Sequence, residues 1–253
     1  MSIYKKNTRL DRLLVERGLA PTRSKAADLI RRGCVKVSGA PALKPGTLMD
    51  PDATLAVSPD ASPYVSRAGL KLAAALESFG FEPEGRVALD LGASTGGFTD
   101  LLIARGAAKV YAVDVGSGQL HAKLRVNPKV VSLEGTDARA LDRALIGERP
   151  EAITADVSFI SLTKALPAAL FLAAPGAWLV ALIKPQFEAG REAVGKGGIV
   201  RSEAARQAAV AKVRHFIEEQ PGWTVLGVIP SPLLGGSGNA EFLLGAVHDP
   251  ADG

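Results

Sequence analysis

Residues 90–100, DLGASTGGFTD, connect a predicted strand to a predicted helix through a glycine-rich turn. Two kinds of enzyme use such a turn. In a serine hydrolase, Gly92-x-Ser94-x-Gly96 would be the nucleophile elbow. In a cofactor-binding fold, the same small residues would let a nucleotide-like ligand approach the backbone. The choice between them depends on residues elsewhere in the chain.

A hydrolase would require a histidine base for Ser94, and the chain contains three histidines. His121 precedes the later carboxylates, His215 lies in a helical pattern, and His248 follows the last predicted strand. An aspartate followed by His248 would give a possible triad order, so a serine hydrolase stays a remote alternative.

The cofactor interpretation is favoured by acidic residues after successive strands. Asp114 ends the second predicted strand, where a carboxylate can accept from both hydroxyls of a ribose, and Asp137 is placed to accept from an adenine amino group. Ser94 replaces a glycine of the dinucleotide fingerprint, which favours S-adenosylmethionine (SAM) over NAD. We assign to the cofactor site Asp90, Gly92, Ala93, Ser94, Gly96, Gly97, Asp114, Val115, Asp137, Ala138 and Asp156.

Helical and strand patterns alternate along most of the chain. The pattern indicates an α/β fold with a Rossmann-like, mostly parallel sheet, and two final strands that form an antiparallel edge. The predicted helices are 67–80, 97–106, 117–125, 138–146 and 161–173; the predicted strands are 86–92, 109–115, 129–135, 151–159, 177–184, 223–231 and 240–247.

The basic charge is concentrated at the N-terminus. Residues 1–60 hold 11 Lys and Arg against 6 Asp and Glu, whereas the remainder holds 19 against 20. A basic module next to a nearly neutral one suggests a polyanionic partner such as nucleic acid. We expect a small N-terminal α+β domain, a linker, a large domain and a short tail, at residues 1–60, 61–66, 67–248 and 249–253.

Several classes of protein are disfavoured. The longest apolar run, 165–183, is interrupted by Pro167, Pro175 and Gly176, as in a buried helix and strand rather than a membrane span. The N-terminus has no apolar signal region, so we expect a cytoplasmic protein that does not enter a membrane. The single Cys34 excludes an internal disulfide, and the absence of a His/Cys cluster leads us to expect no metal.

Residues 9–39, RLDRLLVERGLAPTRSKAADLIRRGCVKVSG, resemble the S4 RNA-binding domain over both of its helices and the following turn. The resemblance implies that a basic surface contacts RNA phosphates, which supply affinity with little sequence information. The residues expected to face RNA are Arg9, Arg12, Arg23, Lys25, Arg31 and Arg32, together with Arg67 at the start of the large domain.

With this domain in place, the chain from about residue 8 to 247 resembles the TlyA family of ribosomal RNA 2′-O-methyltransferases, whose catalytic domain is of the FtsJ type. The resemblance implies a Lys-Asp-Lys-Glu tetrad at Lys71, Asp156, Lys184 and Glu241, with Phe159 lining the RNA side of the site. The motifs that carry it are YVSRAGLKL (64–72), GASTGGFTD (92–100), ADVSFIS (155–161), LIKPQFE (182–188) and GNAEFLL (238–244).

The residues suit this reaction. A ribose 2′-hydroxyl is a weak nucleophile, and Lys184 is the candidate base because nearby Lys71 should help one ammonium to lose its proton. Asp156 and Glu241 would orient the two lysines and reduce the cost of burying their charge. Methylation of cytosine C5 would need a cysteine nucleophile, and Cys34 lies in the other domain.

The expected substrate is ribosomal RNA, free or in a ribosomal subunit, at a cytidine. The short C-terminus resembles the family's shorter subtype, which implies large-subunit RNA more than both subunits. The alternative from another class is a non-catalytic RNA-binding or ribosome-assembly factor that retains the fold. The glycine-rich loop 187–200 is either a mobile flap over RNA or an ordinary surface loop. Members of the family are sometimes labelled haemolysins.

Overall fold

The computed structural model describes residues 7–31, 33–42, 44–58, 64–235 and 238–249. The chain divides into two compact units, Met1–Arg67 and Ala68–Gly253. The domain boundaries expected from the sequence stay predictions, and residues 61–63 of the expected linker and 250–253 of the tail lie outside the described residues.

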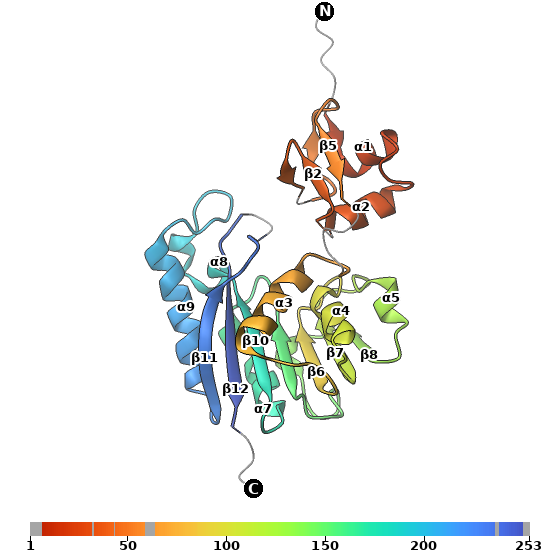
Figure 1. Ribbon diagram of the computed structural model, residues 1–253. Helices are drawn as coiled ribbons and strands as arrows, with labels where there is room; N and C mark the ends of the chain where they lie inside the picture. The colour runs from red at the N-terminus through yellow and green to blue at the C-terminus, as the bar shows by residue number, and fades with distance from the viewer. Residues whose placement is uncertain (1–6, 32, 43, 59–63, 236–237, 250–253) are drawn as a thin grey trace, which may run out of the picture. The chain divides into compact units, whose positions relative to one another are not determined.

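The first unit is a small α+β structure (Figure 1). Its helices α1 and α2 pack through Leu10, Leu14, Ala26 and Ile30, which are all buried. Two of its strands form an antiparallel pair, and the other three form an antiparallel sheet in the order β3-β2-β5. The elements are β1 (Thr8–Arg9), α1 (Leu10–Glu16), α2 (Arg23–Arg31), β2 (Val35–Val37), β3 (Ala40–Pro41), β4 (Leu48–Met49) and β5 (Leu55–Val57).

The second unit contains a seven-stranded sheet in the order β11-β12-β10-β9-β6-β7-β8. The five strands from β10 to β8 are parallel, whereas β12 is antiparallel to both of its neighbours. The predicted Rossmann-like sheet with an antiparallel edge is therefore confirmed. The strands are β6 (Val87–Leu91), β7 (Lys109–Asp114), β8 (Val130–Glu134), β9 (Ala152–Ala155), β10 (Trp178–Ile183), β11 (Trp223–Pro230) and β12 (Phe242–His248).

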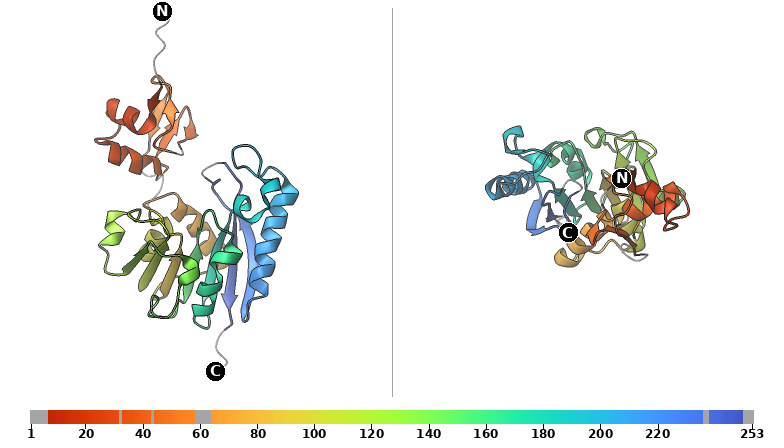
Figure 2. Two further views of the ribbon diagram at one scale, coloured as in Figure 1. Left: turned by 180° about the vertical axis from the view of Figure 1, so that it is seen from behind. Right: turned by 90° about the horizontal axis from the view of Figure 1, so that it is seen from above.

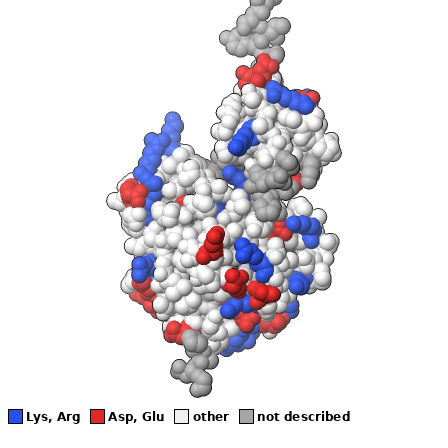
Figure 3. All heavy atoms as spheres, viewed as in Figure 1, with Lys and Arg blue, Asp and Glu red and all other residues white. Residues whose placement is uncertain are grey.

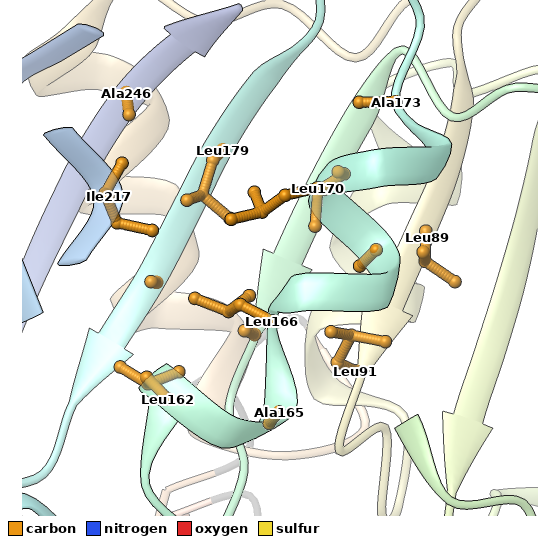
Figure 4. Packing of buried hydrophobic residues seen from close by; sticks show 14 of the residues in the cluster. Leu89, Leu91, Leu162, Ala165, Leu166, Leu170, Ala173, Leu179, Ile217 and Ala246 are labelled. Carbon is orange, nitrogen blue, oxygen red and sulfur yellow. The ribbon is translucent and has the colours of Figure 1, made fainter. Parts of the chain in front are cut away.

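Helices cover both faces of this sheet (Figures 1 and 2). On one face lie α3 (Ala68–Phe79) and α4 (Gly97–Ala104); on the other lie α6 (Leu162–Ala165), α7 (Pro167–Leu172) and α9 (Glu203–Glu218). Figure 4 shows Leu162, Leu166 and Leu170 packed towards the strands. Burial of each such leucine contributes about 1.5–3 kcal/mol. This core holds the strand ends at fixed spacing.

Three expected elements differ in the structure. The helix expected at 161–173 is divided into α6 and α7 because Pro167 has no N–H to donate, and it begins α7 instead. The helices expected at 117–125 and 138–146 are reduced to α5 (Ala122–Arg125) and the short 3-10 helix η1 (Ala138–Ala140). The strand expected at 151–159 ends at Ala155, so residues 156–161 form a loop at the end of β9.

Candidate functional site

The turn after β6 has a backbone that requires glycine at Gly92. Its φ is +78°, and a Cβ there would lie 2.6 Å from the backbone oxygen of Asp156. The amides of Gly92 and Ala93 both donate to the Val113 carbonyl, at 2.8 and 3.0 Å. The turn is therefore fixed against β7, with only backbone facing the loop that follows β9. Gly96 adopts φ +95° as the residue that precedes α4, which begins at Gly97.

Ser94 has φ +47°, a strained conformation that a nucleophile elbow would also show. Its hydroxyl, however, contacts Gln119 Oε1 at 3.1 Å. The three histidines are engaged elsewhere: His121 Nδ1 accepts from Lys123 N, His215 lies 3.1 Å from Glu219, and His248 Nδ1 lies 3.1 Å from Ala174 O. A hydrolase needs a base on its serine, so this arrangement does not support one.

Asp114 is held at the carboxyl end of β7 by two backbone donors. The Ser94 amide donates to Oδ2 at 2.8 Å, and the Gly116 amide donates to Oδ1 at 2.7 Å. Each oxygen retains a second lone pair, so the carboxylate can still accept from a ligand. Asp114 and its exposed neighbour Val115 both line the large cavity of this unit.

Asp137 also lines this cavity, beside Ala138, but its carboxylate is engaged by Arg139. Arg139 donates from its backbone amide and from Nε and Nη2, with contacts of 2.5–3.0 Å. These hydrogen bonds lower the pKa of Asp137 to about 2. An adenine amino group would have to share the carboxylate with Arg139, a residue that sequence reasoning did not identify.

Asp90, which the sequence assigned to the cofactor site, lies instead in the interior of the sheet. It is fully buried, and the hydroxyls of Thr99 and Thr154 donate to its two oxygens at 2.6 and 2.9 Å. It is absent from the residues that line the cavity. Asp90 therefore braces the strand beneath the turn, and burial raises its pKa to about 6.

We expect the substitution D90N to change how stability depends on pH. The folded pKa of Asp90 is raised, so its stabilising contribution is complete below pH 4 and is lost as the pH rises through 6. An asparagine amide does not titrate, and the stability of the variant relative to the native protein should rise by about 3 kcal/mol between pH 4 and 8. Urea unfolding across this range measures the difference; a constant difference would contradict the prediction.

The cavity is continuous along the carboxyl edge of the sheet. Its volume is about 1170 Å³, which exceeds the roughly 300–1,000 Å³ of common small-molecule sites. It extends from Gly92 and Asp114 past Asp137 to Asp156 and Phe159, and then to Phe187 and Lys212. The space can therefore take a nucleoside-sized ligand together with part of a second molecule.

Two ion pairs join the four residues of the expected tetrad. Lys184, directly after β10, places Nζ 2.6 Å from Asp156 Oδ1, and Lys71 of α3 places Nζ 2.5 Å from Glu241 Oε2. The Lys71 and Glu241 side chains are only 11% and 3% exposed. Pairing limits the cost of burying these charges.

The sheet register brings the two pairs to one place. Ile183 of β10 is opposite Phe242 of β12, so the neighbouring Lys184 and Glu241 occupy adjacent positions across the two strands. Asp156 follows β9, on the other side of β10, and its amide donates to Leu91 O beside Gly92. All four residues thus belong to the edge of the sheet where the cavity lies, although only Asp156 of the four lines it.

Ser158 and Phe159 occupy the loop beside Asp156. Ser158 Oγ accepts from Lys184 Nζ at 2.9 Å and lines the cavity, a contact that sequence reasoning missed. Phe159 has φ +65°, is 92% exposed, and has its ring centroid 5.2 Å from that of Phe187. A strained backbone that holds an exposed aromatic ring in a cavity is typical of a ligand-contacting residue.

The glycine-rich loop after Lys184 is anchored at its far end. Asn239, which is 1% exposed, accepts from Val200 N at 2.9 Å and donates to Gly198 O at 2.8 Å. These bonds tie the loop to the segment that leads to Glu241. The sequence suggested only a turn at Asn239, because its partners lie about 40 residues away along the chain.

In the first unit, the buried carboxylate of Asp11 gathers two of the expected RNA-contacting arginines. Arg9 and Arg23 donate to it at 2.8 and 3.3 Å, and the Arg9 hydrogen bond is the largest cause that lowers its pKa to about 2. Arg12 pairs with Glu16, Arg31 is exposed, and the Arg67 amide donates to Arg31 O. Arg32 lies outside the described residues, as does the side chain of Lys25.

Basic and acidic side chains are interspersed on the visible face of the second unit (Figure 3). Within the described ranges, none of the helices is both long and apolar enough to span a membrane. In the same part of the chain, His, Cys, Asp and Glu side chains form no group of three or more that could hold a metal ion.

Comparison with known proteins identifies relatives for both units. A family model described as FtsJ-like methyltransferase matches residues 64–247, and an S4 domain model matches residues 8–55. The chain is 48% identical to the 16S/23S rRNA (cytidine-2′-O)-methyltransferase TlyA of Mycobacterium tuberculosis, over 94% of this chain and 89% of that protein. It is 39% identical to the 23S rRNA (cytidine-2′-O)-methyltransferase TlyA of Campylobacter jejuni, over 71% and 69%. A solved structure of a Streptococcus thermophilus protein named as a hemolysin has a TM-score of 0.75 at 40% identity, over 97% of this chain and 90% of that one.

Proposed function

The chain belongs to the TlyA family of FtsJ-like methyltransferases that carry an S4 domain, and from this membership we propose that it methylates the 2′-hydroxyl of a cytidine in ribosomal RNA. The methyl donor is SAM. The single observation that carries this proposal is the meeting of two Lys–carboxylate pairs at the edge of the sheet where the cavity opens. A non-catalytic RNA-binding factor would have no use for two buried ion pairs at this position.

The residues of the cavity fit the donor. Gly92 leaves bare backbone where a Cβ would fill the space, and Asp114 offers lone pairs for the two hydroxyls of a ribose. Val115 and Ala138 offer apolar contacts, and Asp137 lies beside them. When bound, SAM supplies a methyl group on a positively charged sulfur, which the nearby Asp156 carboxylate favours.

Lys184 acts on the attacking oxygen in this proposal. The O–H bond of the ribose must break as its oxygen gains a methyl group, and Lys184 Nζ accepts that proton from the uncharged state of its amine. Asp156 and Ser158, at 2.6 and 2.9 Å, orient the nitrogen. Glu241 holds Lys71 beside them, and Phe159 supports the target nucleotide.

The first unit supplies RNA affinity. Arg9, Arg12, Arg23 and Arg31 contact phosphates, with Asp11 fixing two of the four guanidinium groups. The protein acts in the cytoplasm on ribosomal RNA or on a ribosomal subunit. The target is in the large subunit.

Mapping of 2′-O-methyl groups on rRNA tests the function. Cells that lack the protein should lose methylation at one cytidine of 23S rRNA, and the purified protein with radiolabelled SAM should restore it on RNA or subunits from those cells. Loss of a 16S mark as well would extend the substrate to both subunits and correct the proposed choice. Identical marks in both cell types, with no transfer in vitro, would contradict methyltransferase function.

A further inference from the structure

Glu188, the last residue of α8 (Pro185–Glu188), is a buried carboxylate that the reaction does not use directly. Its side chain is only 1% exposed. Leu162 N donates to Oε1 at 2.7 Å, and the Ser161 hydroxyl donates to Oε2 at 2.5 Å. Lys212 of α9 lies 3.5 Å from Oε2 and donates to the backbone oxygen of Glu188 at 3.0 Å. The carboxylate thus has a partner from each of two other elements.

These contacts connect the two segments that carry the Lys184–Asp156 pair. Residues 156–161 run from the end of β9 to α6, and residues 184–188 run from the end of β10 through α8. At their near ends the segments meet through Lys184 and Asp156, and further along through Phe159 and Phe187. Glu188 closes the far end, so the two segments are tied at both ends.

The chemistry of the brace indicates more than packing. Burying a carboxylate is costly unless it is paired and hydrogen-bonded, and an apolar side chain would fill the space at lower cost. What Glu188 adds is direction, because its two oxygens fix the Ser161 hydroxyl and the Leu162 amide at defined positions. The loop between these atoms and β9 contains the strained Phe159, which needs its surroundings to hold it.

We propose that Glu188 is a positioning residue that sets the place of Asp156, Ser158 and Phe159 relative to Lys184. The proposal rests on the proposed function, because the geometry that it maintains is that of methyl transfer. A misplacement of about 1 Å can cost about 10²-fold in rate. E188A, which removes every side-chain contact, should lower kcat by about 100-fold. E188Q keeps the Leu162 contact and should lose about 10-fold.

The donor side of the cavity is built from β6, β7 and their loops, which Glu188 does not touch. The KM for SAM should therefore stay within about twofold of the native value in both variants, while kcat falls. The matched control is E218Q, which changes an exposed glutamate that pairs with Arg214 on α9 and should leave kcat unchanged. Thermal unfolding of each variant, with rates normalised to folded protein, separates positioning from loss of fold.

The outcomes separate the two proposals. A native protein that transfers no methyl group to rRNA overturns the proposed function and the role of Glu188 with it. A native protein that is active, with E188Q and E188A both at the native kcat, overturns the role of Glu188 alone. If E188A fails to fold, E188Q decides: a native kcat, or a fall in kcat matched by an equal rise in the KM for SAM, also overturns the positioning role.

Discussion

The substitution K184A is expected to lower methyl transfer to ribosomal RNA by at least about 10³-fold, because general-base catalysis contributes about 10²–10⁴-fold and Asp156 loses its ion-pair partner as well. Binding of RNA should survive, since the phosphate contacts expected of the first unit are untouched. Transfer of a radiolabelled methyl group measures the first effect, and a filter-binding titration measures the second.

The matched control for this prediction is K109A. Lys109 also forms an ion pair, with Glu148, but it begins β7 at the end of the sheet opposite the cavity. We expect K109A to keep the native rate. A K184A variant that methylates RNA as fast as K109A would remove Lys184 from the mechanism and leave the function to be explained by other groups.

The substitution G92A should abolish donor binding and destabilise the fold. The new methyl group would lie 2.6 Å from a backbone oxygen that follows β9, and an alanine at φ +78° adds strain of about 1–3 kcal/mol. Relief of the clash would require the turn or the loop 156–161 to move, and both form the floor of the cavity. We expect a loss of SAM affinity of at least about 100-fold by calorimetry, together with a lower free energy of unfolding.

Gly80 provides the comparison. It has φ +68°, follows α3, and a Cβ there would meet no atom within 4 Å. G80A should therefore show backbone strain alone and bind SAM as the native protein does. Equal SAM affinities for G92A and G80A would show that the close approach at Gly92 has no part in donor binding.

The sheet was predictable because its strands are short apolar runs with acidic residues at their ends. Asp114 and Asp156 could be placed at the carboxyl edge from their position after a strand alone, since that edge is common to all parallel strands. The same rule misplaced Asp90, which precedes the end of β6 and whose side chain is directed into the interior. A position one residue nearer or farther along a strand changes which face a side chain meets.

Contacts between distant segments could not be predicted in this way. The bonds of Glu188 to Leu162 and of Asn239 to Val200 depend on how loops fold over the sheet, and no local pattern encodes them. The division of the helix at Pro167 was visible in principle, because proline cannot continue a hydrogen-bonded turn. The lysine–carboxylate pairs were expected from family resemblance rather than from spacing.

The antiparallel strand β12 has a consequence for how much of the chain the protein can lose. An antiparallel strand starts where its parallel neighbour stops, so Glu241 reaches Lys184 from the opposite chain direction, only 12 residues before the C-terminus. A premature stop codon anywhere upstream of this point would remove both the counter-charge of Lys71 and the strand that lies between β10 and β11. Late truncations should therefore be as damaging as early ones.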